Sequence, residues 1–148
     1  MIIIAHNIRS MYNVGSIFRN AAAFNIEKLY LTGISAIPPR KEIAKVALGA
    51  VDLVNWEAGE IEEVITRLKT EGYHVYGLEQ GKGSISLDVV VGGLQNKKIA
   101  LVLGNEVEGI DKETIKLLDG LIEIPMGKKR SLNVSVASGI AMFVLGSK

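Results

Sequence analysis

The residues best suited to chemistry stand in the last quarter of the sequence, where a basic loop runs into hydroxyl and amide side chains. The apolar run that ends near Pro125 is followed by Lys-Lys-Arg at 128–130, and then by Ser131 and Asn133 in front of an apolar helical pattern. A strand end followed by a helix start leaves backbone N–H groups free. Free N–H groups and nearby cations favour phosphate. The segment therefore predicts chemistry on a phosphate-bearing substrate.

Glu106 is the second candidate, in the segment Gly-Asn-Glu-Val-Glu-Gly at 104–109. This is not a P-loop, because Ile110-Asp111 stands where lysine and a hydroxyl residue would hold phosphate and magnesium. It also lacks the dinucleotide-binding pattern GxGxxG. Ligands of open parallel sheets bind beyond the carboxyl ends of the strands, so Glu106 is in place to orient a substrate or a basic side chain. A plain tight turn is the alternative, which explains the glycines but not the residues between them.

Asn13 and Arg19 form a third candidate pair, six residues apart and so separated by nearly two helical turns. Purely structural roles are the alternative for these residues. Asn13 would then cap a helix, and Arg19 would be solvated or ion-paired. Ser131 and Asn133 would likewise cap the last helix, since both residue types are good caps.

Strands alternating with helices must position these residues. β-Branched apolar runs predict strands at 2–5, 28–31, 51–54, 74–78, 99–103 and 121–124. Helical patterns lie between most of them, at 14–24, 40–48, 61–70, 112–118 and 134–145. The alternation is typical of an α/β fold whose mostly parallel sheet carries helices on both faces. Asn13 is expected to cap the first helix and Asp111 to begin the fourth.

Composition narrows the class of protein. The 148 residues fit one domain, 1–148, and the absence of cysteine excludes disulfides and thiolate metal sites. His6 and His74 are the only imidazoles, so we expect no metal. The N-terminus does not resemble an export signal, and the apolar segment 134–145 is shorter than the roughly 20 residues that span a bilayer. We therefore expect a soluble cytoplasmic protein without a membrane partner.

The formal net charge of +1 neither requires nor excludes nucleic acid, because a balanced total can hide a basic face. Basic side chains do gather in or beside predicted loops and helix starts, whereas acidic ones concentrate in helices such as 60–63. Scattered, solvated cations are the alternative interpretation.

Three segments taken together resemble one family. Asn-x-Gly-x-x-x-Arg at 13–19, Leu-Gly-Asn-Glu-x-x-Gly at 103–109, and Ile-Pro-Met followed by Ser-Leu-Asn-Val-Ser at 124–135 are similar to the SpoU, or TrmH-like, RNA 2′-O-ribose methyltransferases of the SPOUT superfamily. Lys-Val-Ala-Leu-Gly-Ala at 45–50 also resembles a segment frequent in that family, so the likeness covers nearly the whole chain.

The resemblance implies a fold, a cofactor and partners. It implies a parallel α/β sheet whose C-terminal part is tied in a trefoil knot, which ordinary chain-topology rules do not predict. It implies a homodimer that binds S-adenosylmethionine and methylates ribose 2′-hydroxyls of tRNA or rRNA. We expect a single SPOUT methyltransferase domain without a separate RNA-binding domain, so the domain itself must supply the RNA contacts.

The resemblance also assigns residues. Those matching positions implicated in catalysis are Asn13, Arg19, Glu106, Ser131 and Asn133. Those matching or near the cofactor segments are Leu78, Gly104, Ile124, Met126 and Leu132. The cations expected to contact RNA are Arg9, Arg40, Lys41, Lys128, Lys129 and Arg130. The sequence departs from the family pattern in one respect: Gly127 follows Met126 directly, so the loop to Ser131 is one residue shorter than usual.

The role of Arg19 and the activity itself each have alternatives. The family proposes the matching arginine as the base or its activator, but arginine scarcely deprotonates in proteins. We prefer a role in which Arg19 clamps a phosphate and stabilises the developing alkoxide. The rival functions are a non-catalytic RNA-binding module that lost cofactor binding through its short loop, and a SPOUT methyltransferase that modifies a base nitrogen. The last helix is apolar around much of its circumference, which predicts one face on the sheet and one on a second subunit.

Overall fold

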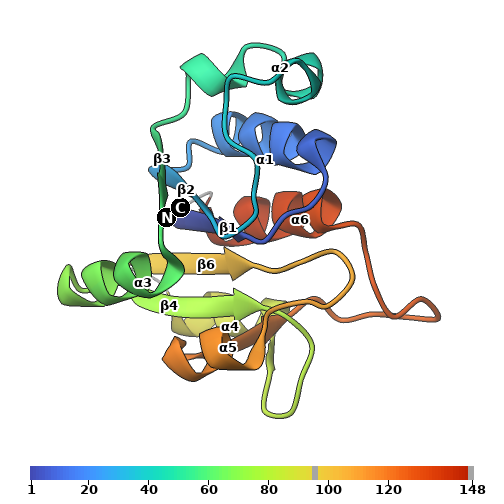
Figure 1. Ribbon diagram of the computed structural model, residues 1–148. Coiled ribbons are helices and arrows are strands. Elements are labelled where there is room, and N and C mark those ends of the chain that lie inside the picture. The colour runs from blue at the N-terminus through green and yellow to red at the C-terminus, as the bar shows by residue number, and fades with distance from the viewer. Residues whose placement is uncertain (95–96, 147–148) are drawn as a thin grey trace.

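The computed structural model describes residues 1–94 and 97–146, which form a parallel sheet flanked by helices (Figure 1). The strand order is β3-β2-β1-β6-β4-β7-β5, and each pairing is parallel. The strands are β1 (Ile2–His6), β2 (Lys28–Thr32), β3 (Trp56–Gly59), β4 (His74–Leu78), β5 (Ile85–Ser86), β6 (Ile99–Leu103) and β7 (Gly120–Glu123). The parallel α/β fold predicted from the alternation is confirmed.

Helices cover both faces of the sheet. They are α1 (Met11–Ala23), α2 (Lys41–Ala47), the short 3-10 helix η1 (Ala50–Asp52), α3 (Ile61–Thr70), α4 (Leu87–Gly93), α5 (Lys112–Leu117) and α6 (Val134–Gly146). Helices α3 and α5 share one core cluster with the sheet, and α1, α4 and α6 share another on the opposite face. Figure 1 shows α2 stacked on α1, on the side away from the sheet.

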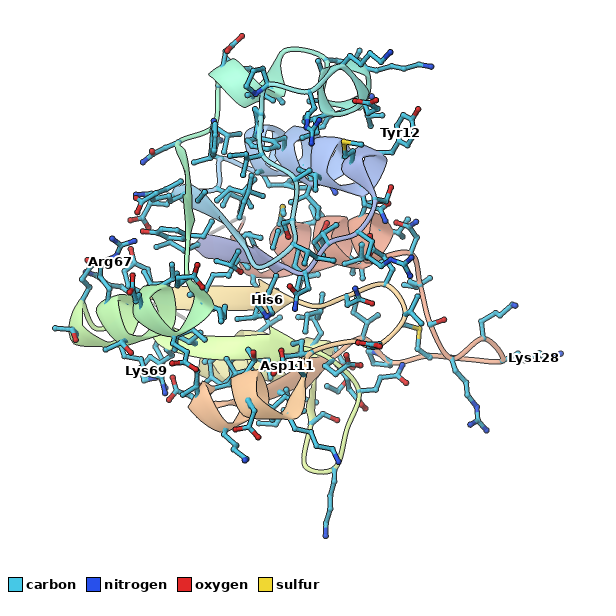
Figure 2. All side chains as sticks on the ribbon, viewed as in Figure 1. His6, Tyr12, Arg67, Lys69, Asp111 and Lys128 are labelled. Carbon is cyan, nitrogen blue, oxygen red and sulfur yellow. The ribbon has the colours of Figure 1, made fainter. Side chains whose placement is uncertain are left out.

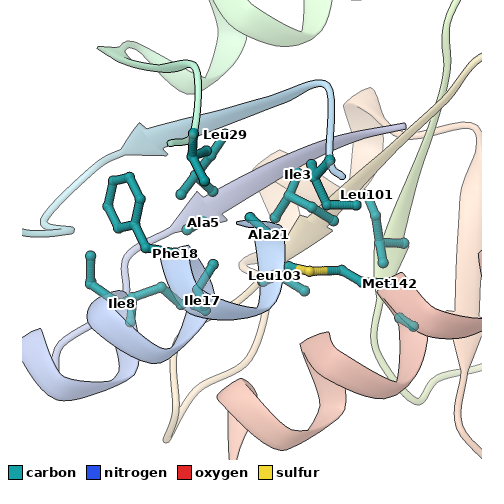
Figure 3. Packing of buried hydrophobic residues seen from close by; sticks show 14 of the residues in the cluster. Ile3, Ala5, Ile8, Ile17, Phe18, Ala21, Leu29, Leu101, Leu103 and Met142 are labelled. Carbon is teal, nitrogen blue, oxygen red and sulfur yellow. The ribbon is translucent and has the colours of Figure 1, made fainter. Parts of the chain in front are cut away.

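Strand β1, which lies between β2 and β6, is buried along its whole length, which explains its continuous apolar run. Ile3 and Ala5 pack in the cluster of α1 and α6, whereas Ile2 and Ile4 pack in the cluster of α3, because successive strand side chains point to opposite faces. Figure 3 shows the first cluster, in which side chains of α1 and Met142 of α6 meet the sheet.

Gly15 has a structural role within the first motif. A Cβ at this position would lie 2.6 Å from the carbonyl oxygen of Ile43 in α2, so only glycine permits the close approach of α1 and α2. The glycine of Asn-x-Gly-x-x-x-Arg thus fixes the helix that carries both of the motif's polar residues.

Two expectations about local structure were wrong. Residues 51–54 are not a strand: the chain forms η1 there, with Ala50 and Val54 buried in the α1 cluster, and the strand beside β2 begins at Trp56. Asn13 does not cap the first helix. The Ser10 side chain accepts the N–H of Asn13 at 3.2 Å, and α1 begins at Met11. The expectation for Asp111 is confirmed, since its side chain accepts the N–H of Thr114 and caps α5.

Within residues 1–94 and 97–146, no helix has the length and apolar character needed to cross a membrane. The same residues contain no cluster of three acidic, histidine or cysteine side chains that would hold a metal ion.

Candidate active site

A cavity of about 200 Å³ opens at the carboxyl ends of the adjacent strands β6, β4 and β7. Its lining includes each residue expected to contact the cofactor, namely Leu78, Gly104, Ile124, Met126 and Leu132. Leu78 is the last residue of β4, and Gly104 directly follows β6. The other three belong to the segment between β7 and α6. Open parallel sheets bind ligands at this edge, so the cavity is the candidate active site.

A tight turn at 104–110 forms one wall of the cavity. Asn105 and Gly109 exchange backbone hydrogen bonds of 3.0 and 2.9 Å. The Asn105 side-chain carbonyl accepts the N–H groups of Val107 and Glu108, and its amide donates to the backbone carbonyl of Asn7 at 2.9 Å. The asparagine of the Gly-Asn-Glu segment therefore shapes the turn and ties it to the end of β1.

Glu106 joins this turn to the start of α1. Its carboxylate accepts the backbone N–H groups of Arg9 at 2.9 Å and Ser10 at 3.0 Å. The side-chain amide of Asn13 donates to the same carboxylate at 2.9 Å. Burial raises the pKa of Glu106, but these three donors outweigh it and hold the pKa below its usual value. Two motif residues that lie 93 positions apart thus meet in one hydrogen-bond network.

Replacing Glu106 with alanine is expected to lower the free energy of unfolding by about 1 kcal/mol at neutral pH, because three donors lose a charged acceptor at an exposed site. The folded-state pKa lies below the unfolded value of about 4.3, so the stabilisation is fully present above that value. It is lost as the pH falls through the folded-state pKa. Urea unfolding of both proteins across this pH range measures the difference.

The matched control for this comparison is Glu108→Ala. Glu108 lies in the same turn, but its carboxylate accepts no hydrogen bond among the residues that the structure describes. Its replacement should change the free energy of unfolding by less than about 0.5 kcal/mol. Equal losses in the two variants would contradict the role given to Glu106.

A buried histidine supports the far end of the turn. His6 Nδ1 lies 2.9 Å from the Thr32 hydroxyl, and its Nε2 lies 3.3 Å from the carboxylate of Asp111, which caps α5. Burial lowers the pKa of His6, although the neighbouring Asp111 carboxylate opposes that shift. The residue directly after the turn is therefore held by a side chain of β1 and caps α5.

Ser131 and Asn133 have different positions although they are close in sequence. Ser131 lines the cavity together with Arg130. The Asn133 side-chain carbonyl accepts two hydrogen bonds from Ser135, one from the backbone N–H at 2.8 Å and one from the hydroxyl at 2.6 Å. Asn133 therefore caps α6. The structural alternative raised for Asn133 is therefore observed, and Ser131 is the hydroxyl that faces the candidate site.

Arg19 does not line the cavity. It is exposed and lies in a separate groove between α1 and α6, with Asn20 and Ile140 among its neighbours. The Asn20 amide fixes the two helices by donating to the carbonyl of Ser135 at 2.8 Å. The groove and the cavity both reach the first turns of α6, since Val134 lines the cavity whereas Ser135 lines the groove. A single chain thus presents Asn13, Glu106 and Ser131 at one site and Arg19 at another.

The six cations expected to contact RNA are all exposed and come from three places: Arg9 precedes α1, Arg40 and Lys41 begin α2, and residues 128–130 belong to the loop before α6. Figure 2 shows Lys128 at the tip of this loop, projecting from the body of the protein. Of the six, only Arg130 also lines the cavity.

Glu79 is a cavity residue that the sequence patterns did not single out. It directly follows β4, its carboxylate accepts the N–H of Ile110 at 3.2 Å, and it lines the cavity beside the turn. The rule that singled out Glu106, a polar residue at the carboxyl end of a parallel strand, applies equally to Glu79. The signal was therefore present in the sequence.

Comparison with known proteins gives consistent relatives. The profile of the SpoU rRNA Methylase family matches residues 1–143. The 23S rRNA (guanosine-2′-O-)-methyltransferase RlmB of Xanthomonas axonopodis pv. citri is 31% identical over 145 residues, which cover 97% of this chain and 57% of the relative. An uncharacterized tRNA/rRNA methyltransferase of Borreliella burgdorferi is 34% identical over 145 residues, covering 96% of this chain and 61% of that protein.

Solved structures agree with the sequence comparison. The AdoMet-bound rRNA methyltransferase from Sinorhizobium meliloti superimposes with a TM-score of 0.90 at 26% identity, over 97% of this chain and 54% of that one. The TrmH/SpoU tRNA modifying enzyme from A. aeolicus gives a TM-score of 0.85 at 27% identity, over 98% of this chain and 73% of that one. The chain therefore spans about three fifths of the curated relatives' length. With a profile match that contains all three motif segments, the chain belongs to the SpoU rRNA methylase family.

Proposed function

We propose that this chain is an S-adenosylmethionine-dependent RNA methyltransferase domain that acts on a ribose 2′-hydroxyl of tRNA or rRNA. The observation that carries the proposal is the cavity at the carboxyl ends of β6, β4 and β7, which gathers all five expected cofactor residues beside Glu106 and Ser131. The printed names of the relatives, an rRNA guanosine-2′-O-methyltransferase and a tRNA modifying enzyme among them, support the same activity.

The lining of the cavity fits this cofactor. Leu78, Ile124 and Leu132 offer apolar surface for the adenine ring of the cofactor. Gly104 has no side chain, so its backbone is exposed in the cavity wall. A Cβ on Gly104 would lie 2.6 Å from the backbone of Gly109, so no side chain can cover the peptide groups there. When bound, S-adenosylmethionine supplies a methyl group already activated on a positively charged sulfur. The protein's task is then chiefly to orient the acceptor hydroxyl.

The shortened loop after Met126 still reaches the cavity. Met126 lines it on one side of the loop, and Arg130, Ser131 and Leu132 line it on the other. We assign to the Ser131 hydroxyl, which lines the cavity, the acceptance of a hydrogen bond that orients the target hydroxyl, and to Glu106 the holding of the start of α1 against the site. Arg19 serves as the phosphate clamp of this proposal, and because it lies outside the cavity of its own chain, it would serve the cavity of a second copy.

Three measurements together test the activity and separate it from the two alternative functions, base methylation and RNA binding without catalysis. Isothermal titration measures S-adenosylmethionine binding, and transfer of a labelled methyl group to tRNA or rRNA measures activity. Alkaline cleavage of the product locates the mark, because a 2′-O-methyl group removes the hydroxyl that attacks the adjacent phosphate. A labelled RNA that remains fully cleavable would indicate base methylation, and RNA binding without cofactor binding would indicate a non-catalytic module.

We propose that two copies of this chain associate through α1 and α6. Val136 and Ile140 of α6 are 50% and 37% exposed and line the groove that also contains Arg19. Phe143, on the same helix, is 62% exposed. Burying such side chains stabilises an interface by roughly 25 cal/mol per Å² of apolar surface. Light scattering at micromolar concentration should therefore give the mass of a dimer, and a monomer would contradict the proposal.

We propose further that the C-terminal segment forms the trefoil knot of the family. Two features support it: β7 lies beyond β4, and α6 packs back against α1, so residues 124–133 cross the carboxyl edge of the sheet between them. Stretching one molecule by its two ends tests this. A knotted chain should reach less than the full extended length of about 3.5 Å per residue, because the tightened knot retains part of the chain.

Replacing Lys128 and Lys129 with alanine is expected to weaken RNA binding and to flatten its dependence on salt, because fewer counterions are released. For single-stranded RNA, the slope of log K against log salt should fall by about 0.7 for each phosphate that the variant no longer neutralises. Neither side chain lines the cavity, so cofactor affinity should stay unchanged. Filter binding across a salt series measures both effects.

Lys69 and Lys98 provide the matched control, because their replacement removes the same charge at the opposite edge of the sheet. Lys98 precedes β6, and Lys69 pairs with Asp119 just before β7 at 2.9 Å. This control should leave the slope unchanged. An unchanged slope and affinity in the Lys128 and Lys129 variant would shift the RNA surface to Arg9, Arg40 and Lys41.

A further inference from the structure

We propose that Glu79 determines which form of the cofactor the cavity prefers: its carboxylate favours the positively charged sulfonium of S-adenosylmethionine over the neutral thioether of S-adenosylhomocysteine. This inference rests on the proposed function and deepens it. It concerns a residue outside the three motif segments, and it predicts a preference that cavity shape alone would not give.

The backbone holds Glu79 in a fixed place at the cavity. Its N–H donates to the carbonyl of Ile122 in β7 at 3.0 Å, which continues the pairing of β4 past its last residue. One carboxylate oxygen accepts the N–H of Gln80 at 3.0 Å, and the other accepts the N–H of Ile110 at 3.2 Å. The charge is therefore positioned by peptide groups of β4, β7 and the 104–110 turn.

Gly109 makes room for this carboxylate. Its φ of +71° places it in the left-handed region, and a Cβ there would overlap a Glu79 carboxylate oxygen. The last glycine of the Leu-Gly-Asn-Glu-x-x-Gly segment is thus matched to a charged residue of a different strand. The two backbone donors occupy only part of the acceptor capacity of the carboxylate, which has about four lone-pair sites.

The charges that line the cavity are unevenly compensated. They are Glu79, Glu106 and Arg130. Glu106 is satisfied by three donors at the start of α1. Glu79 forms no salt bridge with any residue in 1–94 or 97–146. The two carboxylates outnumber the one guanidinium, so the cavity carries excess negative charge on the side of β4.

This charge distinguishes the two cofactor forms by electrostatics. The two molecules differ by one methyl group and one positive charge, and an opposite charge within a partly enclosed site strengthens binding of the cation. Methyl transfer removes that charge from the bound molecule. Glu79 would therefore hold S-adenosylmethionine and release S-adenosylhomocysteine more readily than a neutral cavity of the same shape.

The test compares ligand affinities in wild-type protein and in Glu79→Gln, which keeps the side-chain shape and removes the charge. Isothermal titration with S-adenosylmethionine, with S-adenosylhomocysteine, and with sinefungin gives three affinities, the last because it carries an ammonium group near the sulfonium position. We expect the variant to bind both cations about tenfold more weakly, or about 1.4 kcal/mol, and the neutral thioether within about twofold of wild type. Glu108→Gln removes a charge from the 104–110 turn at a residue that does not line the cavity, so it should change none of the three.

Each remaining result counts against a specific claim. If Glu79→Gln bound all three ligands more weakly by the same factor, Glu79 would have a structural role only, and the inference would be overturned. Unchanged affinities for all three would overturn it as well. Wild-type protein that binds none of the ligands would overturn the proposed function, and the inference with it. Thermal unfolding without ligand shows whether the variant is folded. If it is not folded, the wild-type protein alone provides the test. Equal affinities of the wild-type protein for sinefungin and for S-adenosylhomocysteine would then overturn the inference.

Discussion

Replacing Arg19 with alanine should reduce methyl transfer by about 10²- to 10³-fold, the usual effect of removing one group that stabilises developing charge. S-Adenosylmethionine affinity should stay within about twofold of wild type, because a twofold change is only about 0.4 kcal/mol and Arg19 does not line the cavity. Arg19→Lys should also fail, since a point charge does not reproduce a planar, two-pronged phosphate clamp. Single-turnover transfer to RNA and titration with cofactor measure the two quantities separately.

Arg67→Ala is the matched control for Arg19. Arg67 is an arginine of α3, on the other face of the sheet, where it pairs with Glu57 at 3.1 Å. Its replacement removes the same charge and should leave transfer unchanged. Near-normal turnover in Arg19→Lys would contradict the clamp, and a large loss of cofactor affinity in Arg19→Ala would place the guanidinium at the cofactor instead.

The contrast between Arg19 and Glu106 shows what the sequence predicts well. The motif residues near strand ends, Gly104 and Glu106, were expected at the carboxyl edge of a parallel sheet, and the cavity lies there. A strand end fixes position because its neighbours end at the same edge. A residue well inside a helix carries no such information. Spacing alone did not show that Arg19 points into a groove with α6 rather than toward Glu106.

The errors in local structure have a related physical cause. In the run at 51–54, Val51 and Val54 pack in the α1 cluster whereas Leu53 is exposed, and burial of this kind does not distinguish a strand from a short helical turn. Ser10 and Asn13 are both good caps, and only the hydrogen bond from Asn13 to Glu106 explains why the asparagine is used elsewhere. That bond joins positions 93 residues apart, beyond the reach of any local pattern.

Replacing Gly104 with alanine should damage the site strongly although it adds only one methyl group. The added Cβ would lie 2.6 Å from the backbone of both Gly109 and Ile110, and backbone cannot move aside as a flexible side chain can. The turn must therefore shift away from β6, which takes Glu106 and the cavity wall with it. Overpacking of this kind costs about 1–3 kcal/mol of stability. We expect cofactor affinity to fall by more than about tenfold, the effect of losing roughly 1.4 kcal/mol of binding energy.

Gly127→Ala separates this effect from the general cost of replacing a glycine. Gly127 is exposed in the loop before Ser131, and a Cβ there would meet nothing within 4 Å. Its replacement should therefore leave both stability and cofactor affinity nearly unchanged. Urea unfolding and titration with S-adenosylmethionine on the two variants decide the matter. If Gly104→Ala bound the cofactor as wild type does, the backbone of the turn would not form the wall of the cofactor site, and the cavity would lose its assigned role.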